Sequence, residues 1–126
     1  MSTPFHDALL RGAGLFDGGQ FFEAHEAWEE HWRVESDPER RRLLQGLIQV
    51  AAALHKLSNL GAADSAARLF TRGLAKLDAC PTLVATLDLG AFCEAVRAYA
   101  RAPAPTRELL DRPRLSALAR QGWGQS

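Results

Sequence analysis

Residues 43–55 read LLQGLIQVAAALH, a run that contains no Asp, Glu, Lys or Arg. Leucines recur along it at the spacing of helix turns, and Ile48 and Ala51 widen the apolar face beyond a narrow stripe. A helix with so broad an apolar face is buried on more than one side. The run therefore predicts a central helix against which the other helices pack.

Proline, glycine and capping residues mark where this helix begins and ends. The preceding Ser36-Asp37-Pro38-Glu39 combines a capping side chain, a proline suited to the first turn and capping-box spacing. Gly61 is the expected C-cap after a helix that ends at about Asn59. The same signals predict five helices, at about residues 5–16, 20–34, 38–59, 63–77 and 83–101. Small residues on the inner face of the fourth, such as Gly73, permit close helix approach.

No segment alternates as a strand does, and the short connections favour antiparallel neighbours. The predicted fold is all-α, an antiparallel bundle of about five helices with a long central third helix. Residues 1–126 are expected to form a single helical domain, because a chain of this length suits one core. Prolines predict an irregular C-terminal tail from about residue 102, with one helical turn near residues 107–111.

Composition limits the class of protein. The chain has 15 Lys and Arg against 15 Asp and Glu, which makes nucleic-acid binding an unfavoured function. No apolar run approaches the ~20 residues of a membrane span, and the first residues lack the order of a signal peptide. Cys80 and Cys93 form no CxxC pair, so we expect reduced thiols, no disulfide framework and a cytoplasmic protein.

Charge is unevenly spread along the chain. Acidic residues gather in residues 17–39 and arginines in residues 97–120. This asymmetry predicts complementarity within the fold or across a homodimer, and a basic tail for an acidic partner is the alternative. The run Arg40-Arg41-Arg42 is expected in a solvated turn or paired with the acidic second helix.

Residues 20–34, QFFEAHEAWEEHWRV, are the informative segment for function. On a helix, His25 and Glu29 fall in the middle of a face made by four large aromatic residues, Phe21, Phe22, Trp28 and Trp32. We therefore expect the pair to be buried and Glu26 to lie on the solvent-exposed face of the helix. Burying an unpaired carboxylate costs several kcal/mol, whereas an exposed helical ion pair gains only about 0.2–0.5 kcal/mol. The pattern predicts that the two groups satisfy each other or hold a ligand.

An imidazole and a carboxylate one helical turn apart can share a divalent cation. His55, at the border of the apolar face of residues 38–59, is the candidate third ligand. The predicted set of His25, Glu29 and His55, with water in the open positions, suits Zn²⁺, Fe²⁺ or Mn²⁺. Gln49, or Gln45 near it, is expected to orient one of the metal-binding side chains without binding the metal itself. The expected pocket residues are Gln49, Phe22, Trp28 and Trp32.

The segment HEAWEEHW contains the pattern HxxxExx(W/Y) at His25, Glu29 and Trp32. Together with LIQVAAALH at residues 47–55 and the small-residue stretch at residues 61–77, it resembles the bacterial and archaeal domain of unknown function number 309. The resemblance covers about residues 15–80. It implies a small helical bundle and suggests metal binding through the motif His and Glu, in a family without a settled activity.

Two functions stay open at this point. The first is a divalent-metal or small-ligand site on His25 and Glu29, which in an enzyme would favour metal-dependent hydrolysis. The second is a non-enzymatic interaction or scaffold module, in which the pair is a structural polar unit with His55 or an arginine. A zincin-type peptidase is disfavoured, because Glu29 stands where its second histidine would be. Whether the protein is an enzyme, and on which substrate, is not determined by these residues.

Overall fold

A computed structural model of the chain describes residues 3–102, 112–115 and 118, and these contain helices but no strand. The all-α prediction is therefore confirmed. The helices are α1 (Pro4–Asp17), α2 (Phe21–Trp32), α3 (Pro38–Asn59), α4 (Ala63–Asp78), α5 (Pro81–Thr86) and α6 (Gly90–Arg101). The helical turn expected near residues 107–111 lies outside the described residues.

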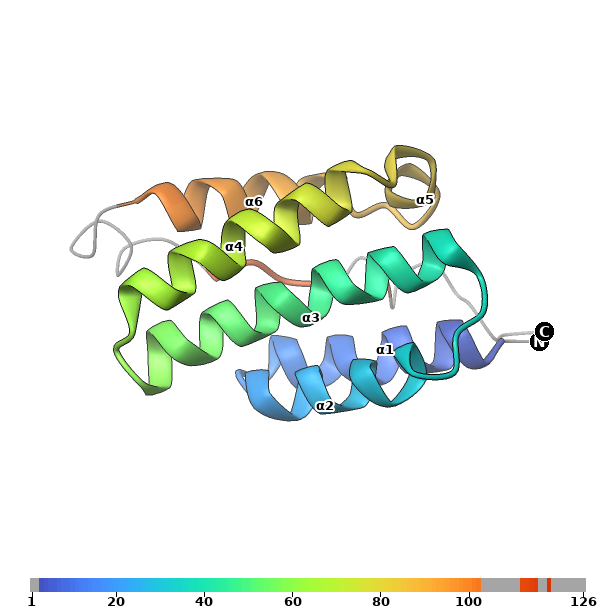
Figure 1. Cartoon of the computed structure of the whole chain (residues 1–126), viewed down its shortest axis with the longest axis horizontal. Coiled ribbons are helices and arrows are strands. Elements are labelled where there is room, and N and C mark those ends of the chain that lie inside the picture. Colours follow the sequence, from blue (N-terminus) through green and yellow to red (C-terminus); the bar gives the residue numbers. More distant parts are fainter. Residues whose placement is uncertain (1–2, 103–111, 116–117, 119–126) are drawn as a thin grey trace.

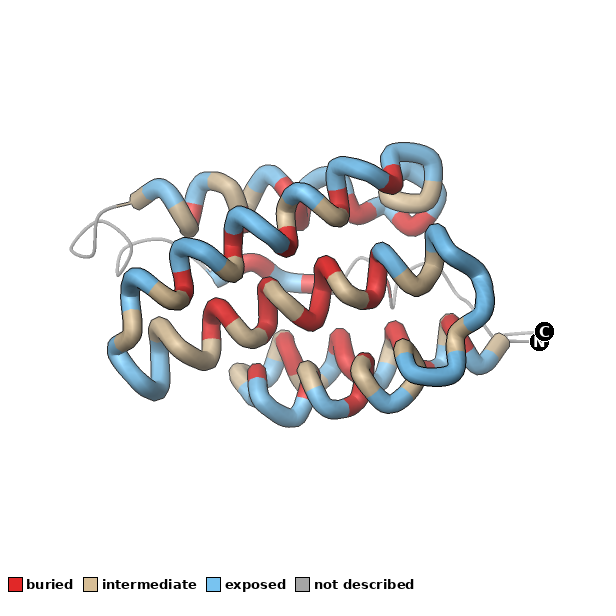
Figure 2. Tube along the Cα trace, in the orientation of Figure 1, coloured by how far each residue is buried: buried red, intermediate tan, exposed pale blue. Residues whose placement is uncertain are grey.

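Helix α3 is the centre of the arrangement, as its uncharged run predicts. It lies between the α1–α2 hairpin and α4, and it also contacts α5 (Figure 1). Helices α1, α2, α3 and α4 alternate in direction along the chain, and α6 returns along α4 (Figure 1). Buried positions recur along nearly the whole of α3 (Figure 2), including Leu43, Leu47 and Val50 at 0% exposure. The core is therefore organised around one helix that is covered on several sides.

The ends of α3 follow the predicted signals. The Asp37 side chain accepts a hydrogen bond of 2.8 Å from the Arg40 backbone N–H, which caps the first turn. At the other end, Gly61 adopts a φ of +62°, a left-handed conformation that glycine takes without steric cost. The predicted range of residues 38–59 is confirmed.

The prediction of a single helix at residues 83–101 is wrong, because a turn between α5 and α6 interrupts the helix there. Asp88 has a φ of 55° and occupies the left-handed position that usually holds glycine. The Leu89 N–H donates to the Val84 carbonyl at 2.9 Å across this turn. Leu87 and Leu89 are both buried, so the break places two leucines in the core. An aspartate in the glycine position is a weak sequence signal, which explains why the break is missed.

Helices α3 and α4 touch at a pair of glycines. A Cβ on Gly73 would lie 2.8 Å from the Gly46 carbonyl oxygen and 2.9 Å from Val50 Cγ2. Real Cβ atoms essentially never come that close to other atoms, so only glycine permits this separation of the two backbones. The expectation that small residues of α4 allow close approach is confirmed.

The described part of the C-terminal tail packs on the helical bundle. Residues 112–115 are irregular, as expected, and the Leu115 N–H donates to Asp17 Oδ1 at 2.7 Å. The Arg114 guanidinium donates to the Asp17 carbonyl at 3.2 Å. Leu115 and Leu118 are buried in the common core. At least one arginine of the basic region therefore contacts the acidic region within the fold.

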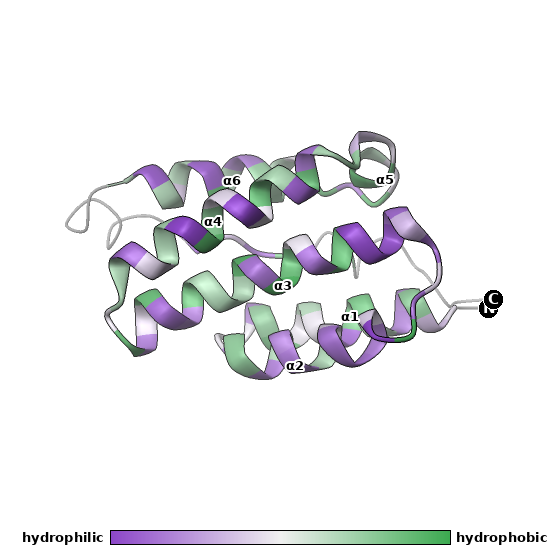
Figure 3. Cartoon of the chain, viewed as in Figure 1, coloured by the Kyte–Doolittle hydropathy of each residue, from purple (hydrophilic) through white to green (hydrophobic). Residues whose placement is uncertain are grey.

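Hydrophilic and hydrophobic residues alternate along the helices (Figure 3). Within the described residues, none of the helices combines the length and the apolar character needed to cross a membrane.

Replacing Gly73 by alanine tests the contact between α3 and α4. We expect Gly73→Ala to lower the free energy of unfolding by about 1–3 kcal/mol, because the new methyl group overpacks a backbone contact. Gly14→Ala is the matched control, since a Cβ there meets nothing within 4 Å. Alanine at that exposed helical position should stabilise the protein by about 0.5–1 kcal/mol. Urea unfolding of both variants measures the difference, and equal effects would contradict the glycine contact.

Candidate functional site

Helix α2 buries a different side from the one its aromatic residues suggest. Its buried residues are Phe21, Ala24, Ala27 and Trp28, whereas the side chains of His25 and Glu29 are 24% and 28% exposed. The expectation that this pair is buried in the core is wrong. Helix α2 contacts both α1 and α3, so its buried side is centred on Ala24 and Trp28. The pair therefore lies at the edge of the core.

Trp28 joins α2 to α1. It is fully buried, and its indole Nε1 donates to the Leu9 carbonyl at 3.4 Å. The ring lies so close to Gly12 that a Cβ there would be 2.0 Å from Trp28 Nε1. Trp28 is thus a core residue of the α1–α2 hairpin rather than a wall of the cavities described below.

The polar cluster consists of His25, Glu26 and Glu29. His25 Nε2 lies 3.3 Å from Glu29 Oε2, and His25 Nδ1 lies 3.3 Å from Glu26 Oε1. One ligand atom from each residue can be chosen so that all three lie within 4.8 Å of one another. Glu26 is 59% exposed, as expected, but its carboxylate reaches back to the imidazole. The structure therefore adds Glu26 to the two residues that the sequence pairs.

A second partner occupies the other oxygen of Glu29. The guanidinium of Arg33, the C-cap residue of α2, donates to Glu29 Oε1 at 2.7 Å. Glu29 thus lies between an imidazole and a guanidinium, and its two oxygens have different partners. Arg33 is 66% exposed, so this ion pair is largely solvated and contributes little stability.

His55 is near the cluster but not in it. The Phe22 ring stacks on the His25 imidazole, with centroids 6.1 Å apart and planes 18° apart. The same ring lies 5.6 Å from the His55 imidazole in a tilted arrangement. Among the described residues, the ligand atoms that gather within 4.8 Å do not include those of His55. Phe22 therefore contacts both imidazoles, and it is 50% exposed.

A cavity of about 220 Å³ opens beside Glu29, between α2 and α3. We call it the α2–α3 cavity; its lining residues are Glu29, Trp32, Gln45, Ile48 and Gln49. Trp32 Nε1 and Gln49 Oε1 are buried and have no hydrogen-bond partner among the described residues. Arg41 fixes Trp32, because its guanidinium lies 3.9 Å from the ring centroid and donates to the Trp32 carbonyl at 2.6 Å. Gln49 and Trp32, two of the expected pocket residues, thus line one cavity.

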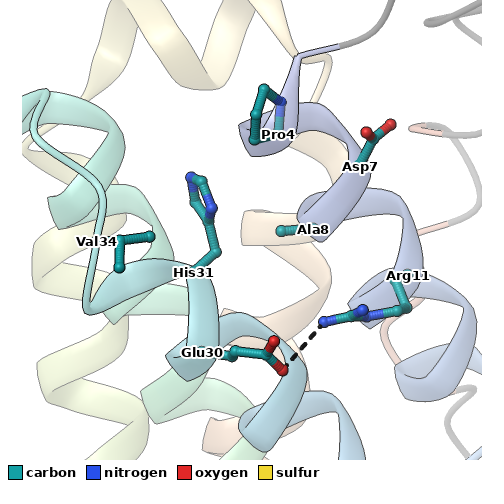
Figure 4. Close-up of a pocket in the computed structure, with 7 residues that line it drawn as sticks. All are labelled: Pro4, Asp7, Ala8, Arg11, Glu30, His31 and Val34. Carbon is teal, nitrogen blue, oxygen red and sulfur yellow. Dashed lines mark hydrogen bonds and ion pairs between the residues drawn. The ribbon is translucent and has the colours of Figure 1, made fainter.

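A second histidine–glutamate pair follows six residues later on the chain. His31 Nε2 lies 2.8 Å from Glu35 Oε1, and the Asp37 N–H donates to Glu35 Oε2 at 3.0 Å. Sequence analysis missed this pair, although it repeats the HxxxE spacing of His25 and Glu29. His31 borders a cavity of about 480 Å³ between α1 and α2, which the Arg11–Glu30 ion pair of 3.4 Å spans (Figure 4).

Glu35 is held as a carboxylate. Burial acts to raise the pKa of its carboxyl, but the Asp37 N–H, the hydrogen bond to His31 and nearby positive charge together bring that pKa below its ordinary value of 4.5. The charged form is therefore preferred in the fold. Since Glu35 caps the turn that leads into α3, the pair has a structural role.

The two cysteines are free and buried. Burial raises the pKa of the Cys93 thiol to about 11 and also raises the pKa of Cys80. Thiolates are thus disfavoured at neutral pH, and neither residue has the character of a cysteine nucleophile.

Glu35→Gln tests the depressed pKa. A carboxyl whose pKa is lowered by folding contributes stability above its unfolded pKa and loses it as the pH falls through the folded one. Between about pH 5 and about pH 3, the wild type should therefore lose more free energy of unfolding than Glu35→Gln. Glu30→Gln is the matched control, because the Glu30 side chain lies nearby in the chain, on α2, and is 76% exposed. Urea unfolding across this range measures the slopes, and parallel curves for wild type and Glu35→Gln would refute the assignment.

Comparison with known proteins shows which family part of this chain resembles. Residues 9–69 match the family described as Domain of unknown function (DUF309). The chain is also 32% identical over 109 residues to an uncharacterized protein of Aquifex aeolicus (strain VF5), a stretch that covers 86% of this chain and 31% of that relative. The chain therefore spans less than a third of the relative's length. No solved structure matches it. Over residues 9–69, which include His25, Glu29 and Trp32, the chain is therefore similar to the DUF309 family.

Proposed function

We propose that the protein binds a divalent transition metal, Zn²⁺, Fe²⁺ or Mn²⁺, through His25 and Glu29. The observation that carries the proposal is the 3.3 Å between His25 Nε2 and Glu29 Oε2. Two ligand atoms that each lie about 2.0–2.2 Å from one tetrahedral ion are about 3.4 Å apart. The two side chains therefore need little movement to share an ion.

Glu26 supports this use of His25. An imidazole that binds metal through one nitrogen normally donates its other N–H to a carboxylate or carbonyl, which fixes the ring. His25 Nδ1 is buried without a hydrogen bond in acceptable geometry, and Glu26 Oε1 lies 3.3 Å away. A small rotation of the exposed Glu26 side chain would complete the bond. We therefore assign Nε2 to the metal and Nδ1–H to Glu26.

We propose His55 as the third ligand. Its imidazole and that of His25 both contact the Phe22 ring. Because Phe22 is half exposed, its ring can turn toward solvent at small cost and let the two imidazoles approach. Water would occupy the positions that the protein leaves open.

Hydrolysis is the reaction class that such a site would support. A divalent ion lowers the pKa of the water it holds toward about 7 and so supplies a nucleophile at neutral pH. The α2–α3 cavity begins at Glu29, which gives a small substrate room beside the proposed ion.

The second candidate is a non-enzymatic interaction or scaffold module. It is favoured by Arg33, which already satisfies Glu29 Oε1 at 2.7 Å while His25 lies beside the other oxygen. In that case the cluster orders α2 and binds no ion. A cytoplasmic location, favoured by the free thiols of Cys80 and Cys93, and assembly as a homodimer stay predictions.

Metal content of protein without a histidine tag separates the two candidates. After incubation with Zn²⁺, Mn²⁺ or Fe²⁺, we expect near-stoichiometric metal in the wild type and its loss in His25→Ala, because one of the two principal ligands is gone. His31→Ala is the matched control, as it removes from α2 the histidine of the other HxxxE pair, His31 and Glu35. Elemental analysis after gel filtration gives the answer. No metal in the wild type, or equal loss in both variants, would contradict the proposal.

A double-mutant cycle tests His55 and Phe22. If Phe22 keeps His55 away from the ion, Phe22→Ala should tighten metal binding by about tenfold, which corresponds to about 1.4 kcal/mol. The gain should vanish in Phe22→Ala/His55→Ala. Isothermal titration with Zn²⁺ measures all four proteins. A gain that persists without His55, or no gain at all, would remove His55 from the ligand set.

A further inference from the structure

We propose that the α2–α3 cavity binds a small uncharged molecule that carries a hydrogen-bond acceptor beside a donor, of which a primary carboxamide is the simplest. As an assignment of substrate class this rests on the proposed function, since the cavity begins at Glu29. The binding step itself needs no metal and is tested without it.

Two buried polar atoms carry the inference. Trp32 Nε1 can only donate a hydrogen bond, and Gln49 Oε1 can only accept one. Both are buried without a partner among the described residues, and both residues line the same cavity. Leaving a buried donor or acceptor unpaired costs about 1–3 kcal/mol, so such atoms in native proteins are nearly always paired. Because the two residues that carry this donor and this acceptor line the same cavity, a molecule bound between them can offer both functions.

The packing around Trp32 keeps the donor in place. Arg41 holds the residue at two points, with its guanidinium over the indole ring and its N–H on the Trp32 carbonyl. Gln49 stands on α3 between Ile48 and Val50, whose exposures are 9% and 0%. Both residues are thus anchored by rigid helices on opposite sides of the cavity. A site prepared in this way loses little conformational entropy on binding.

The charges around the cavity favour a neutral ligand. Among the described residues, its lining contains no Lys or Arg, and Glu29 is the only ionisable member. The Glu29 carboxylate would repel an anion. An organic cation would have to compete for Glu29 with Arg33 and His25, which already lie beside its two oxygens. In a carboxamide, the carbonyl would accept from Trp32 Nε1–H and the NH₂ would donate to Gln49 Oε1.

The volume selects small molecules. At about 220 Å³ the cavity is below the range of about 300–1,000 Å³ that is usual for drug-sized ligands. The Ile48 side chain and the Trp32 ring supply the apolar surface for a short substituent. We therefore expect amides with few carbons to fit.

The test is a titration of the metal-free protein with acetamide, followed by the indole N–H signal of Trp32 in ¹⁵N–¹H NMR spectra. Trp32→Phe identifies that signal among those of the three tryptophans. We expect a saturable shift with acetamide and none with acetate, which has the same shape but carries a charge. A shift that rises linearly without saturation, or that acetate produces equally, would overturn the proposal.

A variant of Gln49 provides the second measurement. Gln49→Leu should weaken acetamide binding by about 3–10-fold, because one hydrogen bond is lost. It should also leave the protein as stable as the wild type or more so, since it removes an unpaired buried oxygen. Gln20→Leu is the control, as the Gln20 side chain makes no capping hydrogen bond at the start of α2. Equal affinities in Gln49→Leu and wild type would overturn the assignment.

The two proposals fail separately. Protein that takes up metal but shows no saturable response to acetamide retains the metal site and loses the amide site. Protein that binds acetamide but no metal retains the amide site and loses the assignment of a metal-dependent substrate.

Discussion

Burial of α3 on several sides is the constraint on which the other helices depend. Its uncharged run carries apolar side chains on several sides, and exposing them to water would be unfavourable. Helices α1, α2, α4 and α5 therefore all pack against it. The closest approach is at Gly46 and Gly73, where the backbones of α3 and α4 touch. This contact sets where α4 lies. The α1–α2 hairpin, held together by Trp28 against Gly12, covers the remaining side.

The candidate site is a consequence of that geometry. Because α2 packs against α1 and α3 at once, its buried side faces between them, and His25 and Glu29 lie on the boundary with solvent. A position at the edge of the core suits a site that exchanges ligands. There the side chains are ordered by packing, while water and small molecules still reach them. The α2–α3 cavity continues from this edge toward α3, where Gln49 stands.

The chain carries two HxxxE pairs close together, and their surroundings give them different geometries. His31 and Glu35 lie 2.8 Å apart, and Glu35 is further tied to the Asp37 N–H, so this pair stabilises the connection into α3. His25 and Glu29 are 3.3 Å apart, with Glu26 and Arg33 on their outer sides. The first arrangement satisfies its groups locally, and the second pair is longer and more exposed to solvent.

The amino-acid sequence is enough to predict the all-α fold, the central α3 with its ends at Pro38 and Asn59, and the pairing of His25 with Glu29. These features depend on local periodicity, capping and i,i+4 geometry, which a chain carries within a few turns. The packing of the helices was needed to show that the pair lies at the edge of the core, that Glu26 joins it and that Phe22 contacts both His25 and His55. It was also needed to show the break at Asp88. The physical reason is that a helical periodicity defines a face but not the neighbour that covers it, and burial depends on that neighbour.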